Sequence, residues 1–133
     1  MELKKNEIRI SVPSSLKNLS LIRSLAKAYF EHEKVDEKDA FQLLTIIDEL
    51  STNVVEHGYD YNMGDIIIEI KKKDNVIFLA VEDNGVGFDE TKISKEEGGL
   101  GLKITRRVSD KFVIEKKENG TLFRIEKKLR EVL

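Results

Sequence analysis

The order of apolar segments along the chain predicts an α/β fold. We expect a two-layer sandwich in which three helices cover one face of a mixed, mostly antiparallel sheet of about five strands. Strand-like segments occur in consecutive pairs, whereas a doubly wound parallel sheet would alternate them strictly with helices. One strand and two segments with helical periodicity precede the first pair, and a third helical segment separates it from the second pair.

The N-terminal part of the chain predicts a strand and a helix. Apolar and polar residues alternate over residues 7–12, and Pro13 ends this strand. Ser14 or Ser15 can cap the helix that follows, which we expect to continue to about Lys34. The side chains expected to face inward from this helix are Leu21, Ile22, Leu25, Ala26, Ala28 and Tyr29.

A second helix is predicted after Asp36, which is a suitable N-cap residue. Asp39, three residues later, weakly resembles the second partner of a capping box. We expect Gly58 to end the helix, because glycine is favoured just after a helix C-terminus. Its predicted apolar stripe consists of Leu43, Ile47, Leu50 and Val54.

The remaining strands are predicted as two pairs. Isoleucines alternate with other residues over 66–70, Asp74-Asn75 forms a turn, and the apolar run over 76–81 predicts a strand buried on both faces. A polar, glycine-rich stretch from 84 to 101 leads into a helix that ends near Asp110.

The last pair of strands covers residues 112–116 and 121–127, joined at Glu118-Asn119-Gly120. An Asn-Gly pair between strand-like segments is a strong signal for a hairpin.

Length and composition predict one domain over residues 1–133 and exclude several functions. Without cysteine, thiolate metal sites and cysteine nucleophiles are excluded. A net charge of -2 argues against direct nucleic-acid binding. The N-terminus lacks the apolar core of a leader peptide, and no apolar run is long enough to span a membrane. We therefore expect a cytoplasmic protein without membrane contact.

Three groups of residues are candidates for chemistry. Glu49 and Asn53 are one helical turn apart, so they share a helix face. An amide oxygen is a suitable Mg²⁺ ligand and a carboxylate can act as a general base, although an isolated pair of this kind is also typical of a solvated helix edge.

The second group is Asp83 with the glycines that follow it. Asp83 ends an apolar strand, so its carboxylate needs a hydrogen-bond donor such as an adenine amine. Gly85 and Gly87 let the backbone approach a flat ligand closely, although an ordinary turn at a strand end has the same pattern.

The third group is the sequence Gly-Gly-Leu-Gly-Leu at 98–102, placed where a helix begins. Free N–H groups and the positive end of the helix dipole would favour a phosphate there, although a flexible loop fits the same composition. Neither the P-loop nor the dinucleotide-binding glycine pattern is present.

Together with Gly120-Thr121, which opens the last strand, these groups resemble the motifs of the GHKL ATPase/kinase superfamily in order and spacing. The strings ELSTNVVEHGY at 49–59 and EGGLGL at 97–102 are similar to motifs of anti-sigma factor kinases of the sporulation and general-stress type. The resemblance implies a Bergerat, histidine-kinase-like ATP-binding fold.

The resemblance also implies roles for individual residues. Glu49 matches the general base and Asn53 the Mg²⁺ ligand, while Asp83 matches the residue that reads adenine. The segment 88–98 would be the lid over ATP. The cofactor-binding residues implied in this way are Asn53, Asp83, Gly85, Gly87, Gly99, Leu100, Gly101, Leu102 and Thr121.

The function implied is that of a serine/threonine-protein kinase that uses ATP and Mg²⁺. Its substrate would be a small anti-sigma factor antagonist protein, its second partner a sigma factor, and its assembly a homodimer. Some sporulation-type members carry an arginine before the second glycine group, where this chain has Glu96-Glu97. The alternative is a non-catalytic ATP-binding module that sequesters a sigma factor or another regulator.

Overall fold

The sheet of the computed structural model has the strand order β1-β2-β3-β5-β4, and every neighbouring pair is antiparallel. The structure describes residues 6–58, 63–85 and 98–130. The strands are β1 (Glu7–Pro13), β2 (Asp65–Lys73), β3 (Val76–Asp83), β4 (Lys111–Lys116) and β5 (Thr121–Lys128). The predicted α/β sandwich with a mostly antiparallel sheet is thus confirmed.

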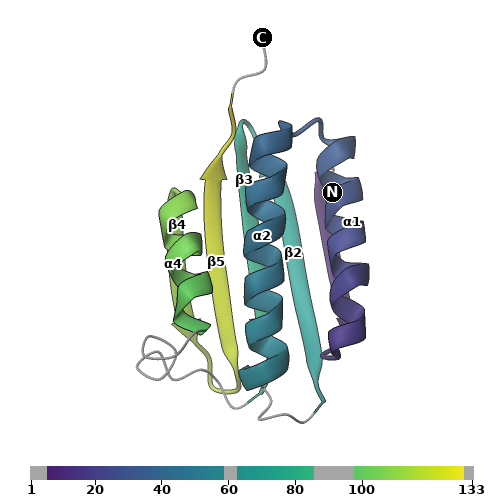
Figure 1. Cartoon of the computed structure of the whole chain (residues 1–133), viewed down its shortest axis with the longest axis vertical. Helices are drawn as coiled ribbons and strands as arrows, with labels where there is room; N and C mark the ends of the chain where they lie inside the picture. Colours follow the sequence, from purple (N-terminus) through teal and green to yellow (C-terminus); the bar gives the residue numbers. More distant parts are fainter. Residues whose placement is uncertain (1–5, 59–62, 86–97, 131–133) are drawn as a thin grey trace, which may run out of the picture.

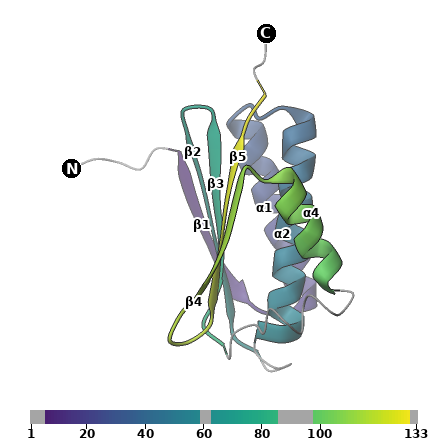
Figure 2. The same cartoon turned by 90° about the vertical axis from the view of Figure 1, so that its left-hand side faces the viewer.

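Three helices cover one face of the sheet, and the opposite face carries no described element (Figures 1 and 2). The helices are α1 (Leu19–His32), α2 (Glu37–Asn53) and α4 (Gly98–Val108). A 3₁₀ turn, η1 (Leu16–Asn18), precedes α1, and a π turn, η2 (Val54–Gly58), follows α2. None of the described helices is long and apolar enough to cross a membrane.

The core lies between the sheet and the helices. Isoleucines at alternate positions of β2 are fully buried, as the period-two pattern predicts. On α2 the predicted stripe of Leu43, Ile47, Leu50 and Val54 is also fully buried. The side chain of Asp36 caps this helix, as predicted, by accepting hydrogen bonds from the backbone of Lys38 and Asp39.

The inward face of α1 differs from the prediction. Ile22, Ala26 and Tyr29 are buried as expected, but Leu21 and Leu25 are 48% and 43% exposed. Helix α1 packs against α2 on one flank and the sheet beneath, so its other flank, which also carries the exposed Ala28, stays open in the described part.

The predicted serine cap of this helix is also wrong. Ser15 occupies the N-cap position of η1 without a side-chain hydrogen bond. The hydroxyl of Ser14 instead accepts a hydrogen bond from the backbone of Gly64, and so joins the end of β1 to the start of β2.

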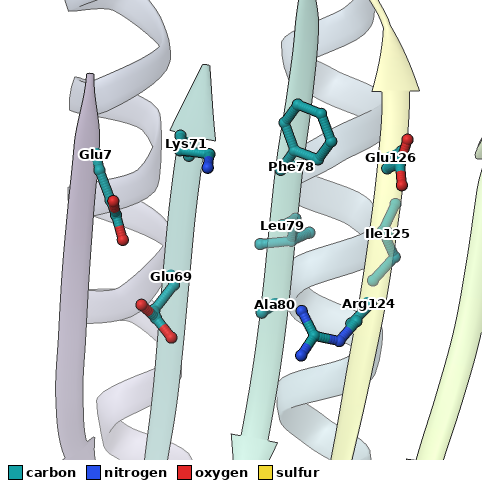
Figure 3. Close-up of a pocket in the computed structure, with 9 residues that line it drawn as sticks. All are labelled: Glu7, Glu69, Lys71, Phe78, Leu79, Ala80, Arg124, Ile125 and Glu126. Carbon is teal, nitrogen blue, oxygen red and sulfur yellow. The ribbon is translucent and has the colours of Figure 1, made fainter. Parts of the chain in front are cut away.

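Strand β3 is buried on one face only, in contrast to the prediction. Its residues Ile77, Leu79 and Val81 are in the core. The alternate residues Phe78 and Ala80 are half-buried on the outer face of the sheet, between charged side chains (Figure 3). The Nζ of Lys71 lies 5.6 Å from the Phe78 ring centroid, so part of this apolar surface is covered by a cation.

An ionic network around the buried Asp39 closes the end of the molecule where α2 begins. Asp39 is 1% exposed, and its carboxylate accepts hydrogen bonds from the backbone N–H of Arg130 at 2.8 Å and from its Nε at 3.3 Å. The Nζ of Lys127 lies 3.8 Å from the same carboxylate and donates to the carbonyl of Val108. The network therefore joins the first turn of α2 to the ends of β5 and α4.

We expect Asp39→Ala to lower the free energy of unfolding by about 3–5 kcal/mol, because it leaves the buried Lys127 without its counter-charge. Urea unfolding followed by circular dichroism measures this. The matched control is Asp36→Ala, which removes only a helix cap and is expected to lower it by about 1 kcal/mol. Equal losses in the two variants would contradict the role given to the network.

Candidate functional site

Four chain segments that carry predicted site residues meet at the other end of the molecule. The C-terminal ends of α2 and β3 and the N-terminal ends of α4 and β5 all lie at the lower end of the view in Figure 1. The antiparallel pairing of β3 with β5 sets Asp83 opposite Thr121. Residues that are far apart in the sequence are thereby gathered at one edge of the core.

Asp83 is fully buried at the last position of β3. Its Oδ1 accepts a hydrogen bond from the backbone N–H of Gly85 at 2.9 Å, whereas its Oδ2 has no partner among the described residues. Burial raises the pKa of this carboxyl, while the Gly85 N–H and the Lys117 ammonium act to lower it. A buried oxygen without a donor is unfavourable, so the site is suited to a ligand that donates a hydrogen bond.

Gly120 makes the backbone approach at this site possible. It is buried with φ of +100°, and a Cβ at this position would lie 2.0 Å from the carbonyl oxygen of Asp83 and 2.8 Å from Cα of Asn84. Only glycine fits both the backbone conformation and the space. The turn between β4 and β5 therefore packs its backbone directly on the end of β3.

Asn53 and Glu49 occupy the last two turns of α2. Asn53 is 5% exposed and its Nδ2 has no partner in the described part of the chain. Since rotation of the amide exchanges its nitrogen and oxygen, either atom can face a ligand. Glu49, one turn earlier, is half-buried. The helix continues after Asn53 as the π turn η2, a feature frequent at functional sites.

The glycine-rich group lies inside a helix instead of before one. Helix α4 begins at Gly98, so Gly99, Leu100 and Gly101 belong to its first turns. The first four N–H groups of a helix have no partner within the helix, which makes this backbone suitable for an anion. Leu102 is 4% exposed and belongs to the core, where it fixes this end of α4.

Two predicted elements lie outside the described residues. These are Gly87 and almost all of the expected lid over 88–98. Arg106 and Arg107, in the last turn of α4, are exposed, and Cζ of Arg106 lies 5.0 Å from the ring centroid of Phe112.

Lys117 belongs to the surroundings of Asp83, although the sequence did not predict a role for it. Its Nζ donates hydrogen bonds to Oε2 of Glu82 at 2.8 Å and to Oδ1 of Asn84 at 2.7 Å. The hairpin was predicted, but the pairing of β5 with β3 that brings this turn to Asp83 is a long-range feature. No local pattern distinguishes Lys117 from its neighbour Lys116.

The donors and acceptors at the site fit a purine nucleotide with a divalent cation. The unpaired carboxylate oxygen of Asp83 suits an exocyclic amine, and the first turn of α4 suits phosphate groups. The amide of Asn53, whose Nδ2 has no partner among the described residues, can supply a hard oxygen ligand after rotation. The described residues contain no group of three or more His, Asp or Glu side chains that could hold a metal ion.

The fold and the site define an ATP-binding domain of the kinase-type ATPases. Residues 12–127 match the family model of the histidine kinase-like ATPase domain, and the chain belongs to this family. Membership implies that ATP binds to this chain.

Curated relatives of similar length also match. The chain is 26% identical over 137 residues to an anti-sigma F factor of Bacillus velezensis, covering 94% of each sequence. It is 27% identical over 135 residues to an anti-sigma F factor of Geobacillus thermodenitrificans, covering 92% of each.

Solved structures support the fold. The structure of the RsbU and RsbW domains of Rv1364c from Mycobacterium tuberculosis matches with a TM-score of 0.74 at 20% identity, covering 92% of this chain and 32% of that one. A chain of the SiaB-SiaC complex from Pseudomonas aeruginosa matches with a TM-score of 0.62 at 11% identity, covering 92% and 88%.

We expect Gly120→Ala to lower the free energy of unfolding by about 1–3 kcal/mol through the backbone conformation alone, with a further loss from displacement of Asp83. Urea unfolding measures the first effect, and weaker ATP binding the second. Asn119→Ala, in the same exposed turn, is the control and should change neither. If the two variants are equally stable, the close backbone packing is not a constraint.

Proposed function

We propose that this protein is an ATP-dependent serine/threonine-protein kinase of the anti-sigma factor type. It would transfer the γ-phosphoryl group of ATP to a Ser or Thr of a small antagonist protein and would control a sigma factor, acting as a homodimer in the cytoplasm. The observation that carries the proposal is the fully buried carboxylate of Asp83, one oxygen of which has no partner among the described residues, at the same end of the molecule as a glycine-rich helix start. The anti-sigma F factors among its relatives support the partner class.

Each residue has a separate task in this proposal. The Oδ2 of Asp83 accepts a hydrogen bond from the adenine amine, with Gly85, Gly87 and Thr121 forming the surroundings of the base. The first turn of α4, with its glycines, binds phosphate oxygens through backbone N–H groups. Asn53 holds Mg²⁺, which neutralises charge on the phosphates when bound.

Glu49 carries out the proton transfer. As the hydroxyl oxygen of the substrate Ser or Thr forms its bond to the γ-phosphorus, the bond to the β–γ bridging oxygen breaks and ADP leaves. The Glu49 carboxylate accepts the hydroxyl proton. In this proposal Glu49, one helical turn before Asn53, serves the phosphate side of the site, and Asp83 reads the base.

A second candidate is a non-catalytic module that binds ATP and sequesters a sigma factor or another regulator. The relatives' names describe anti-sigma factors, which is compatible with sequestration alone. The presence of a half-buried Glu49 next to Asn53 favours the kinase, because a pure binding module has no need of a base.

We expect Asp83→Asn to weaken ATP binding by about 1–3 kcal/mol, because the substitution places an amide donor against the adenine amine. Isothermal titration calorimetry with ATP and Mg²⁺ measures the affinity. The control is Asp74→Asn, an exposed turn residue with φ of 55° that asparagine tolerates well. Unchanged affinity in Asp83→Asn would remove Asp83 from the adenine site.

Glu49→Gln should separate chemistry from binding. We expect near-normal ATP affinity and a rate of phosphoryl transfer lowered by about 10²–10⁴-fold, since glutamine cannot accept the proton. The assay is transfer of labelled phosphate to the cognate antagonist, with the exposed Glu56→Gln as control. Transfer at the parent rate would show that Glu49 is not the base. If the parent protein transfers phosphate to no antagonist, the non-catalytic module is the correct function.

A further inference from the structure

We propose that Lys117 is a positioning residue for adenine recognition, because it fastens the turn between β4 and β5 to the end of β3 and so fixes the orientation of Asp83. This inference rests on the proposed binding of ATP at Asp83. It adds a residue outside the family motifs to the determinants of base specificity.

Lys117 makes three hydrogen bonds that tie the turn together. Its Nζ donates to the Glu82 carboxylate at 2.8 Å and to the Asn84 side-chain oxygen at 2.7 Å, and its backbone N–H donates to the carbonyl of Gly120 at 3.0 Å. The side chains of Lys117 and Glu82 are 25% and 24% exposed, so this pair is partly shielded from solvent. Glu82 and Asn84 flank Asp83 on both sides in the sequence.

The position of the end of β3 relative to the turn between β4 and β5 depends on these contacts of Lys117. Asp83 is the last residue of the strand, and the ladder with β5 ends at its pairing with Thr121. Gly120 permits the turn to approach the Asp83 backbone, but it has no side chain to hold the two segments together. The contacts of Lys117 span this junction and restrict movement of Asn84, and with it the direction of the Asp83 carboxylate.

The positive charge of Lys117 also favours recognition of adenine by Asp83. Burial raises the pKa of Asp83, and the Glu82 carboxylate adds to this, whereas the Gly85 N–H and the Lys117 ammonium act to lower it. An ionised carboxylate only accepts hydrogen bonds and therefore matches the amine of adenine. A protonated carboxyl also donates, and would match the keto oxygen of hypoxanthine. Lys117 therefore favours adenine over a 6-keto purine.

The test compares ADP with IDP, whose hypoxanthine base has a keto oxygen in place of the amine. Affinities are measured by calorimetry in EDTA, between pH 5.5 and 8.0, for the parent, Lys117→Met, Lys117→Arg and Lys116→Met. Lys116 is exposed in the adjacent position, so its substitution controls for the change in net charge. Thermal unfolding of each variant is measured in parallel.

We expect Lys117→Met to bind ADP about fivefold to tenfold more weakly than the parent at pH 7.5, with IDP affected much less. In Lys117→Met the pKa of Asp83 should rise further, because the ammonium group that acts to lower it is absent. Asp83 then becomes protonated at a higher pH, so the weakening of ADP binding on acidification should begin at a higher pH than in the parent. Lys117→Arg should restore most of the ADP affinity, and Lys116→Met should match the parent.

A double-mutant cycle tests whether Lys117 acts on ADP binding through its contact with Asn84. Asn84→Ala removes the same contact from the other side, so the losses in ADP affinity from Lys117→Met and Asn84→Ala should be less than additive. Full additivity would contradict the proposal.

Two other results would overturn the inference. One is unchanged ADP affinity in Lys117→Met while the parent binds ADP, which leaves the proposed function intact. The other is an equal loss for ADP and IDP, which makes Lys117 a merely structural residue. If the parent itself binds no adenine nucleotide, the proposed function and this inference both fail.

Discussion

The buried carboxylate of Asp83 is the constraint on which the rest of the site depends. A carboxylate at the edge of an apolar core is unfavourable unless donors surround it, and the described residues supply a donor to only one of its two oxygens. The glycine at position 120, the turn that carries it and the contacts of Lys117 are all arranged around the strand end that holds this carboxylate. The second oxygen can therefore accept a hydrogen bond from a bound ligand that carries a donor.

The two ends of the molecule have different roles: one contains a paired ionic network that stabilises the fold, and the other contains the candidate site. At one end, the buried carboxylate of Asp39 is paired with Lys127 and Arg130. At the other end, the Nδ2 of Asn53 and the Oδ2 of Asp83 are buried and have no partner in the described part of the chain. Helix α2 runs between the two ends, so its first turn is held by the C-terminal strand while its last turns present Glu49 and Asn53. Anchoring the far end of a helix is an effective way to keep a distant side chain in place, since a packed helix moves as a rigid body.

The local patterns predicted most of the framework and of the candidate site. The cap at Asp36, the buried stripe of α2, the isoleucines of β2 and the final hairpin follow from short-range rules, and the structure has all of them. The segment ends that carry Asn53, Asp83 and Thr121, together with the start of α4, lie at one end of the molecule (Figure 1). The predictions were wrong where exposure depends on neighbouring elements. Leu21 and Leu25 are exposed because no described element covers that flank of α1, and Phe78 is half-buried because no described helix covers the outer face of the sheet.

The sequence by itself determined the elements, their order and the chemical types at the candidate site, because periodicity, caps, turns and motif spacing act over a few residues. Only the tertiary structure decided which lysine contacts the residues beside Asp83. Lys117 and Lys116 are equivalent in the sequence, but the insertion of β5 between β3 and β4 turns one of them to Glu82 and Asn84. In the same way, Asp39 resembled part of a capping box and proved to be the partner of residues about ninety positions later. Such pairings depend on strand order across the whole sheet, which no local pattern contains.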